Sequence, residues 1–404
     1  MNCILLDQQN SSRLWPLSRT RPVAGLRIGI LTIEEKWSVI LSCKTSNLCN
    51  SQLQQVFKLN IESDNLVISG SILPNESTTE KILQLESGEC ILDKQDQFVA
   101  GRLNDSDCNS LYNSYSQQTL TESLKKFKCS TIDSVQRLEY PWQIFQWNGD
   151  EIIKDYKLIT QGRTSQKIDS TNSIIGENIF VEEGAVIQCS ILNSSTGPIY
   201  IGKSAEVMEG SIIRGPFALC DHASTKLGTK IYGPTTIGPN CKVGGEVNNS
   251  VFQSNSNKAH DGFIGNSVIG EWCNIGADSN NSNLKNTYTE VKLWNYETNS
   301  FLRTGSIFCG LVMGDHAKCG INTMFNTGTV VGVGANIFGS GFPRQFIPDF
   351  AWGGASGFKT FTFKEFLETA KAVMNRRKKE LSSEEVLLLE NIFIKTKEYR
   401  TWED

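Results

Sequence analysis

The feature that most constrains the fold is a six-residue periodicity in the middle of the chain. An apolar residue, often followed by Gly or a small polar residue, returns every six positions in five frames. Such spacing is typical of short parallel strands joined by tight turns, in which the apolar side chain points inward and Gly or Asn takes a positive φ. The frames are Ile175, Val181, Ile187; Ile201, Val207, Ile213, Leu219; Ile231, Ile237, Val243; Ile269, Ile275; and Met313, Cys319, Phe325, Val331, Ile337.

Three six-residue units make one triangular coil, and stacked coils cover one another's apolar centres. A β-sandwich with regular turns is the alternative, but its strands usually recur at about 8 to 12 residues. The periodicity therefore predicts a parallel β-helix.

The repeat is interrupted twice. One gap lies between Val251 and Ile264 and contains His260, one of only three histidines. The other is a long excursion at 277–312, rich in Asn, Thr and aromatic residues. Loops that leave a regular solenoid often carry its binding functions.

The chain before residue 170 has the pattern of an α/β domain. We expect strands at 3–7, 37–43 and 65–73, a hairpin at 90–103, and helices at 121–127 and 141–156. The expected organisation is an α/β domain at 1–155, a linker at 156–172, a β-helix at 173–345 with its excursion, and a helical tail at 346–404.

Two helix starts are expected in the tail. TFKE (362–365) and SSEE (382–385) have the capping-box arrangement. The basic run 376–379 is interpreted as a solvated helix end, with a phosphate site as the second choice.

Composition narrows the function classes. A net charge of −4 and 20% charged residues argue against a nucleic-acid or anionic-membrane partner. The first residues hold too short an apolar run for a signal peptide, so we expect a cytoplasmic protein. The 12 cysteines include no CxxC pair, so reduced and mostly buried thiols are expected, and no metal site.

The segment SSRLWPLSRTRPV (11–23) resembles the signature of sugar-1-phosphate nucleotidyltransferases. In that family a Gly-rich loop cradles nucleotide phosphates, and an arginine, here Arg13, binds the charge that develops during phosphoryl transfer. This chain departs from the pattern at 7–12, which contains no glycine, and at Val23, where the family has lysine.

Other charged residues are candidates to compensate for these departures. Arg19, Arg21 and Arg27 could replace lost positive charge, although a surface arginine cluster is as often structural. Asp105 and Asp107 are weak candidates for a metal-binding aspartate, and Mg²⁺ would be required only if this domain is active.

The combination of both regions resembles GlmU, the bifunctional uridylyltransferase and glucosamine-1-phosphate acetyltransferase. TRPVAGLRIGILTIEEKW and SNKAHDGFIGNSVIGEWCNIGAD are similar to the GlmU-related sugar nucleotidyltransferases of Bacteroidetes-type bacteria. The resemblance covers about residues 1–358 and implies a left-handed β-helix. The general rule for parallel crossovers would have given a right-handed one.

The resemblance assigns roles around the first gap. In NKAHDGFIGNSVIG followed by NIGAD, His260 matches the family's general base and Asn274 its substrate-binding asparagine. Imidazole titrates near working pH, which suits it to take a proton from an attacking sugar amine. Lys258 is expected to contact the substrate, and a loop histidine bonded to a neighbouring coil is the structural alternative for His260.

Further substrate-binding positions depart from the family. The phosphate-binding lysine is Asn248 here, and the following tyrosine is Phe263. Arg214, Asp221 and His222 are the candidate replacements for a family arginine. A neutral sugar or a nucleotide sugar therefore fits better than glucosamine 1-phosphate. His316 lies in a regular frame and is expected to be structural.

The resemblance also implies an acyl-CoA donor, acetyl-CoA in GlmU, bound between the subunits of a homotrimer. Lys285 and Arg303 of the excursion are candidates for the phosphates of CoA, and Trp294 or Tyr296 for its adenine. The aromatic residues are equally interpretable as packing anchors between subunits.

Three functions remain open. The first is acyl transfer to a sugar, sugar phosphate or nucleotide sugar, with a degenerate nucleotidyltransferase domain. The second is a sugar-1-phosphate uridylyl- or thymidylyltransferase whose β-helix serves trimerisation. The third is a non-catalytic scaffold.

Overall fold

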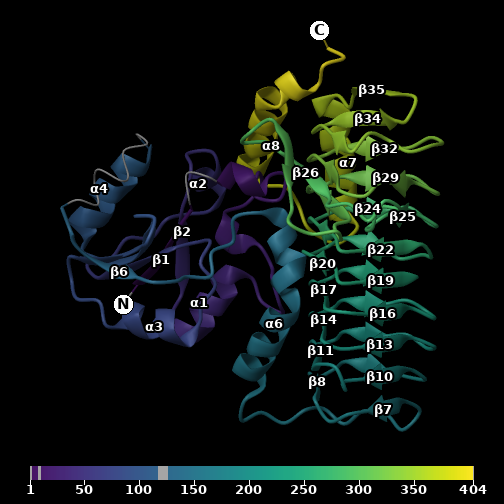
Figure 1. The fold of residues 1–404 in the computed structure, drawn as a ribbon, viewed down its shortest axis with the longest axis horizontal. Helices are drawn as coiled ribbons and strands as arrows, with labels where there is room; N and C mark the ends of the chain where they lie inside the picture. Colours follow the sequence, from purple (N-terminus) through teal and green to yellow (C-terminus); the bar gives the residue numbers. More distant parts are fainter. Residues whose placement is uncertain (1, 8–10, 117–125, 404) are drawn as a thin grey trace. The chain divides into compact units, whose positions relative to one another are not determined.

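The computed structural model describes residues 2–7, 11–116 and 126–403 (Figure 1). These residues form two compact units whose boundaries interleave along the chain. The first unit contains Met1–Leu14, Thr20–Leu26 and Leu31–Glu139, and the second contains Trp15–Arg19, Arg27–Ile30 and Tyr140–Asp404. Two short N-terminal segments therefore belong to the second unit.

The first unit has a six-stranded mixed sheet in the order β2-β1-β3-β5-β4-β6. Its strands are β1 (Asn2–Leu6), β2 (Thr45–Leu48), β3 (Asn65–Ser69), β4 (Glu89–Asp93), β5 (Phe98–Leu103) and β6 (Lys128–Ile132). Its helices are η1 (Ser11–Leu14), η2 (Val23–Gly25), α1 (Ile33–Leu41), α2 (Leu53–Val56), α3 (Glu76–Leu83) and α4 (Asp105–Ser116). Only β5 runs antiparallel to its neighbours, so the other five strands end at the same edge of the sheet.

The expected strand at 3–7 and hairpin at 90–103 are confirmed, and the strand expected at 65–73 is confirmed over Asn65–Ser69. The strand expected at 37–43 is wrong, because α1 occupies most of this segment. A capping box between Thr32 and Glu35 starts the helix, and burial of Trp37 outweighs the strand preference of the β-branched residues. Most of the helix expected at 121–127 lies outside the described residues.

The second unit is a left-handed parallel β-helix with three faces (Figure 1). The first face contains β7 (Ser173–Ile175), β10 (Ile191–Asn193), β13 (Ile212–Arg214), β16 (Lys230–Tyr232), β19 (Glu246–Asn248) and β22 (Phe263–Gly265). The second face contains β8 (Ile179–Val181), β11 (Ile199–Ile201), β14 (Phe217–Leu219), β17 (Thr235–Ile237), β20 (Val251–Phe252), β23 (Val268–Ile269), β28 (Leu311–Met313), β31 (Thr329–Val331) and β33 (Phe346–Ile347). The third face contains β9 (Val186–Ile187), β12 (Glu206–Val207), β15 (Ser224–Thr225), β18 (Lys242–Val243), β21 (Asn257–Lys258), β24 (Asn274–Ile275), β29 (Lys318–Cys319), β32 (Asn336–Ile337), β34 (Ala351–Gly354) and the antiparallel β35 (Gly357–Thr360).

The register confirms the sequence periodicity. Ile201 pairs with Leu219, and Leu219 pairs with Ile237, so one coil takes 18 residues here, and all three side chains are buried. In the first frame Val181 and Ile187 are buried as expected, but Ile175 is one residue out of register. Leu192 pairs with Ile174, so Ile175 points outward and is 49% exposed.

The excursion is inserted after β25 (Asn280–Asn281), which pairs with β30 (Met324–Phe325). It forms a hairpin of β26 (Lys292–Asn295) and β27 (Ser300–Arg303). Tyr296 donates a hydrogen bond to Asp349, and its ring packs against the Arg19 guanidinium. The excursion therefore lies over the last coils of its own chain.

Helix α6 (Pro141–Thr160) packs against the second face and extends into the expected linker. The close approach requires Gly149, because a Cβ there would meet Pro234 at 2.9 Å. Asp155 and Asn148 of α6 accept hydrogen bonds from the main chain of Arg27–Ile30, which lies beside the same face.

The tail forms α7 (Phe363–Asn375), α8 (Ser383–Lys395) and η3 (Lys397–Tyr399). Thr362 and Ser382 cap the two longer helices as expected. The basic run 376–379 is not simply solvated, because Arg377 donates hydrogen bonds to the carbonyl oxygen of Asn240 and to Asn257.

No helix in the described part of the chain is long and apolar enough to cross a lipid bilayer. All 12 cysteines are described, and all are free.

Candidate functional site

A change in corner length shapes the β-helix around His260. Four residues connect β15 to β16, β21 to β22 and β24 to β25 at the corner that leads from the third face to the next coil. Only Gly244 and Gly245 connect β18 to β19. This corner therefore projects less than its neighbours and leaves a recess between them.

Both glycines are required at this short corner. A Cβ on Gly244 would lie 2.5 Å from the carbonyl oxygen of Ala259, and Gly245 has a φ of +73°. A side chain at either position would strain the backbone.

The recess has a volume of about 670 Å³, within the range of small-molecule sites. Corners of five successive coils line it: Met208, Lys226, Leu227, Gly244, Gly245, Ala259, His260, Asp261, Ala277 and Asp278. It thus combines apolar side chains with one ammonium group, one imidazole and two carboxylates.

His260 is exposed at the rim of this recess. Its imidazole has no hydrogen-bond partner among the described residues, unlike the structural histidine that was the alternative expectation. An exposed and unengaged imidazole beside a recess can accept a proton from a bound molecule.

Lys226 is a member of the site that sequence reasoning missed. Its Nζ lies 3.5 Å from the Met208 sulfur, a weak acceptor, so its charge remains available to a ligand. The signal was the 18-residue spacing: Thr225 pairs with Val243, which places Lys226 beside Gly244.

Two residues expected to act with His260 on the substrate do not line the recess. Asn274 is exposed on the third face, paired with Asn257 and Lys318, and does not line the recess. Lys258 is fully buried inside the coil. Its side chain is therefore not exposed for the direct contact with substrate that was expected.

The remaining substrate candidates lie on the first face. Arg214 is exposed at the end of β13, Asn248 ends β19, and Phe263 begins β22. None of the three lines the recess.

His222 and His316 occupy equivalent corners between the second and third faces. Both have positive φ, 57° and 61°, as do Asn240, Asn255 and Trp272 in the coils between them. His316 packs between the rings of Trp272 and Phe366. The expected structural role of His316 agrees with this placement.

The three cofactor candidates make contacts within the excursion or to the coils it covers. Lys285 donates to the carbonyl oxygen of Glu290, and Arg303 pairs with the Glu290 carboxylate at 3.3 Å. Trp294 stacks on Phe346 with ring centroids 4.3 Å apart. Trp294 thus packs within its own chain, and a packing role between subunits stays a prediction.

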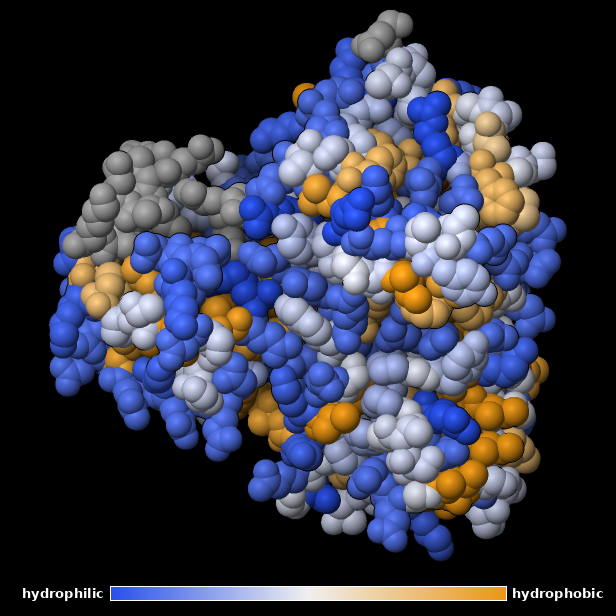
Figure 2. All heavy atoms as spheres, in the orientation of Figure 1, coloured by the Kyte–Doolittle hydropathy of each residue, from blue (hydrophilic) through white to orange (hydrophobic). Residues whose placement is uncertain are grey.

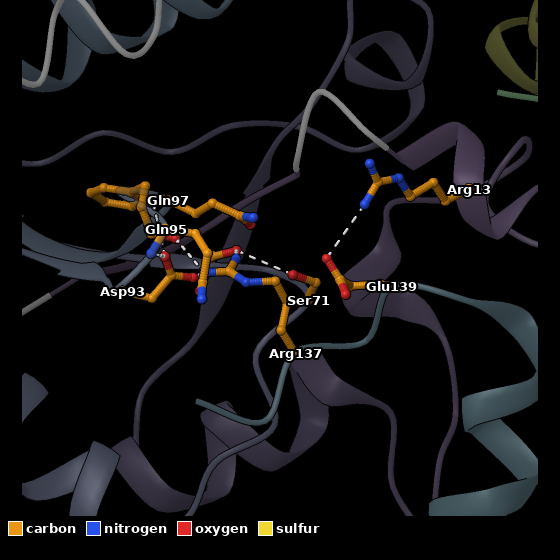
Figure 3. Close-up of polar contacts among 9 residues, drawn as sticks. Arg13, Ser71, Asp93, Gln95, Gln97, Arg137 and Glu139 are labelled. Carbon is orange, nitrogen blue, oxygen red and sulfur yellow. Dashed lines mark hydrogen bonds and ion pairs between the residues drawn. The ribbon is translucent and has the colours of Figure 1, made fainter. Parts of the chain in front are cut away.

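The first unit has a second polar cluster at the carboxyl ends of its strands. Figure 3 shows Arg13 facing Glu139, and their side-chain atoms are 3.5 Å apart. The cavity that the described residues form beside Arg13 has a volume of about 10 Å³. This space holds about one water molecule. Residues 8–10 of the glycine-free loop lie outside the described part.

Arg137 organises the rest of this cluster (Figure 3). It donates to Asp93 at 2.9 Å, to Ser69 at 3.1 Å and to the carbonyl oxygen of Phe98 at 3.1 Å. Burial lowers the pKa of its guanidinium group, and the pair with Asp93 counteracts this effect. Arg137 thus joins the ends of β3, β4 and β5.

The first unit does not fit Mg²⁺ through the expected aspartates. Asp105 is exposed on α4, and Asp107 pairs with Lys126 at 2.9 Å. Within the described ranges no three His, Cys, Asp or Glu side chains converge as metal ligands.

The expected compensating arginines are also engaged elsewhere. Arg19 lies in the second unit, 3.6 Å above the Trp15 ring, and Arg27 donates to the carbonyl oxygen of Ile30. Arg21 is buried in the first unit.

Residues 3–164 match the model of the family described as sugar nucleotidyl transferase. A search of curated proteins returned no match. The resemblance noted in the sequence is confirmed for the N-terminal region by the family model and for the repeats by the fold.

Solved structures that are similar to this chain include two acyltransferases and an acetyltransferase. The UDP-N-acetylglucosamine acyltransferase of Francisella novicida is 13% identical, with 55% of this chain and 89% of that chain covered and a TM-score of 0.33. The polySia-specific acetyltransferase NeuO is 14% identical, with 48% and 87% covered and a TM-score of 0.27. The Arabidopsis UDP-N-acetylglucosamine acyltransferase is 16% identical, with 52% and 80% covered and a TM-score of 0.25.

Proposed function

We propose that the β-helix is an acyl-CoA-dependent transferase that acylates an amino sugar, carried as a sugar phosphate or nucleotide sugar. The observation that supports this most is the recess at the short Gly244–Gly245 corner, with the unengaged imidazole of His260 at its rim. The resemblance of the surrounding segment to the GlmU acetyltransferase motif supports the same role.

The reaction uses His260 as general base. The acceptor nitrogen attacks the thioester carbonyl carbon while one of its protons moves to the imidazole. The tetrahedral intermediate then collapses, the C–S bond breaks, and the imidazolium returns the proton to the departing thiolate. The products are an amide and free CoA thiol.

The charged groups of the recess suggest how the acceptor is held. The ammonium group of Lys226 would bind a phosphate, and the carboxylates of Asp261 and Asp278 would attract the amino group. Lys226 thereby replaces the phosphate-binding lysine that is absent at Asn248.

Thiol release measured with acetyl-CoA and a panel of amino sugars, sugar 1-phosphates and UDP- or dTDP-sugars tests this function. We expect release with at least one acceptor that carries both an amine and a phosphate. No release and no acyl-CoA binding with any member of the panel would contradict it.

The second candidate is nucleotidyl transfer by the first unit. The family match at 3–164 and the position of Arg13 favour it. Release of pyrophosphate from UTP or dTTP with a sugar 1-phosphate, abolished in Arg13→Ala, would establish this activity.

A further inference from the structure

Lys258 occupies a position where the repeat demands an apolar side chain. It pairs with Val243 in the preceding coil, and the equivalent residue of the next coil is Ile275. Its side chain is fully buried. Placing an ammonium group inside an apolar coil is unfavourable unless hydrogen bonds compensate it, so its contacts indicate its role.

The ammonium group binds the corner that carries His260. Its Nζ donates to the carbonyl oxygen of Asp261 at 2.8 Å and to that of His260. Both acceptors belong to the four residues 259–262 that connect β21 to β22.

These bonds coincide with an irregular backbone. In other corners of this column the third residue has positive φ: Gly210, Gly228, Asp278 and Asn322. Here the third residue, Asp261, does not have a positive φ. The fourth residue, Gly262, takes a φ of +108° instead.

The hydrogen-bond ladder between coils shifts in the same way. The amide of Gly228 donates to the carbonyl oxygen of Glu209, and that of Asn322 to Ala277, the second residue of each preceding corner. The amide of Asp278 donates instead to Asp261, the third residue. The second residue here is His260, whose carbonyl oxygen is bound by Lys258.

We infer that Lys258 is a positioning residue, which holds the corner 259–262 in the irregular conformation that presents the His260 imidazole to the recess. It does so by turning two carbonyl groups inward, so it never has to touch substrate. A role of Lys258 in catalysis, through His260, rests on the proposed acyl transfer. Its role in fixing the conformation of residues 259–262 does not depend on that function.

The test uses NMR of protein labelled at histidine Cε1, where the three histidines give three signals assigned with His→Gln variants. Lys258→Met keeps an unbranched side chain and places an apolar group among apolar neighbours. We expect the His260 signal and the amide resonances of 259–262 and Asp278 to move, while the His222 and His316 signals stay in place.

Lys318→Met is the matched control. Its Nζ donates to the carbonyl oxygen of His316 at 2.9 Å, and burial lowers its pKa to about 8, as for Lys258. This variant should move the His316 signal and leave His260 unchanged. Unchanged His260 and 259–262 signals in Lys258→Met would overturn the inference.

Titration of the wild type gives a second readout that needs no variant to fold. Lys258 faces the carboxylates of Asp261 and Asp278 and the Cys319 thiol, and burial lowers its pKa to about 8. As pH rises through 8, the charge-assisted bonds weaken, and the resonances of 259–262 should shift with that midpoint. Resonances that stay constant from pH 7 to about 9.5 would contradict the role of the ammonium group. Neither NMR readout depends on enzymatic activity. A failure of the proposed function would appear instead as absence of thiol release, so the two failures can be distinguished.

Discussion

The side-chain amide of Gln253 pairs with the main chain of Arg27, 226 residues earlier in the chain. The Arg27 amide donates to Oε1 of Gln253 at 2.7 Å, and Nε2 of Gln253 donates to the Arg27 carbonyl oxygen at 3.2 Å. Both residues are buried. The β-helix unit is therefore completed by an N-terminal segment that sequence boundaries would assign to the other domain.

Loss of this pairing should destabilise the second unit. Gln253→Leu leaves a buried amide and a buried carbonyl of Arg27 without partners, which should lower the free energy of unfolding by roughly 2–4 kcal/mol. Urea unfolding measures this change, with the exposed Gln188→Leu as control. An equal, small effect of both substitutions would show that the pairing contributes nothing.

Narrowing the recess should weaken ligand binding without affecting the fold. Leu227 and Ile321 are both 70% exposed at equivalent corner positions, but only Leu227 lines the recess. We expect Leu227→Trp to weaken binding of the acyl donor or acceptor about tenfold or more, a loss of about 1.4 kcal/mol. Calorimetric titration should show no change for Ile321→Trp, and equal affinities for the two variants would place the ligand elsewhere.

The first face carries an exposed apolar surface that fits association of copies. Figure 2 shows apolar side chains gathered over β7, β10 and β13, where Ile175, Ile191 and Ile212 are 49%, 38% and 50% exposed. Such contiguous patches usually mark interfaces. We predict a homotrimer in sedimentation equilibrium, dissociated by Ile212→Glu. Leu83→Glu in α3, at 51% exposure, is the control and should leave the mass unchanged; a monomeric wild type would refute the prediction.

The buried charge of Lys258 predicts a pH dependence of stability. Its pKa is about 8 in the folded protein, because burial penalises the charged form, and about 10.4 in an unfolded chain. Between these values the folded state binds fewer protons than the unfolded state, so folding becomes more favourable as pH rises.

Wild-type stability should therefore increase relative to Lys258→Met from pH 8 to about 10, by at most about 1.4 kcal/mol per pH unit. Denaturant unfolding at several pH values measures the difference. For Lys242→Met, at an exposed position of β18, the difference in free energy of unfolding from wild type should not change with pH. If the difference for Lys258→Met is also independent of pH, the ammonium group of Lys258 is not buried in the folded protein.

Periodicity predicted the β-helix because each coil repeats one spatial relationship, so the inward positions Ile201, Leu219 and Ile237 are visible in the sequence. The strand expected at 37–43 is wrong because the signal for α1, the capping box of Thr32 and Glu35, precedes this apolar run. Interleaving of the two units was not predictable, since it depends on the long-range pairing of Arg27 with Gln253.

The candidate site was predictable only in part. His260 stood out because it interrupts the repeat, whereas Lys226 was overlooked because it lies in a regular corner. Its role arises only from the shortening at Gly244–Gly245, which is visible when corners of successive coils are aligned. Lys258 was assigned to the substrate because side-chain direction cannot be read from its neighbours in the motif.

The initial rate of acyl-CoA-dependent thiol release in His260→Gln, compared with His222→Gln, tests the central claim most directly. Both histidines are exposed at corners of the same β-helix, but only His260 lines the recess. Loss of the general base should lower kcat by about 10²–10⁴-fold in His260→Gln and leave His222→Gln at the wild-type rate. Equal rates in wild type and His260→Gln would contradict the assignment of His260 as the base.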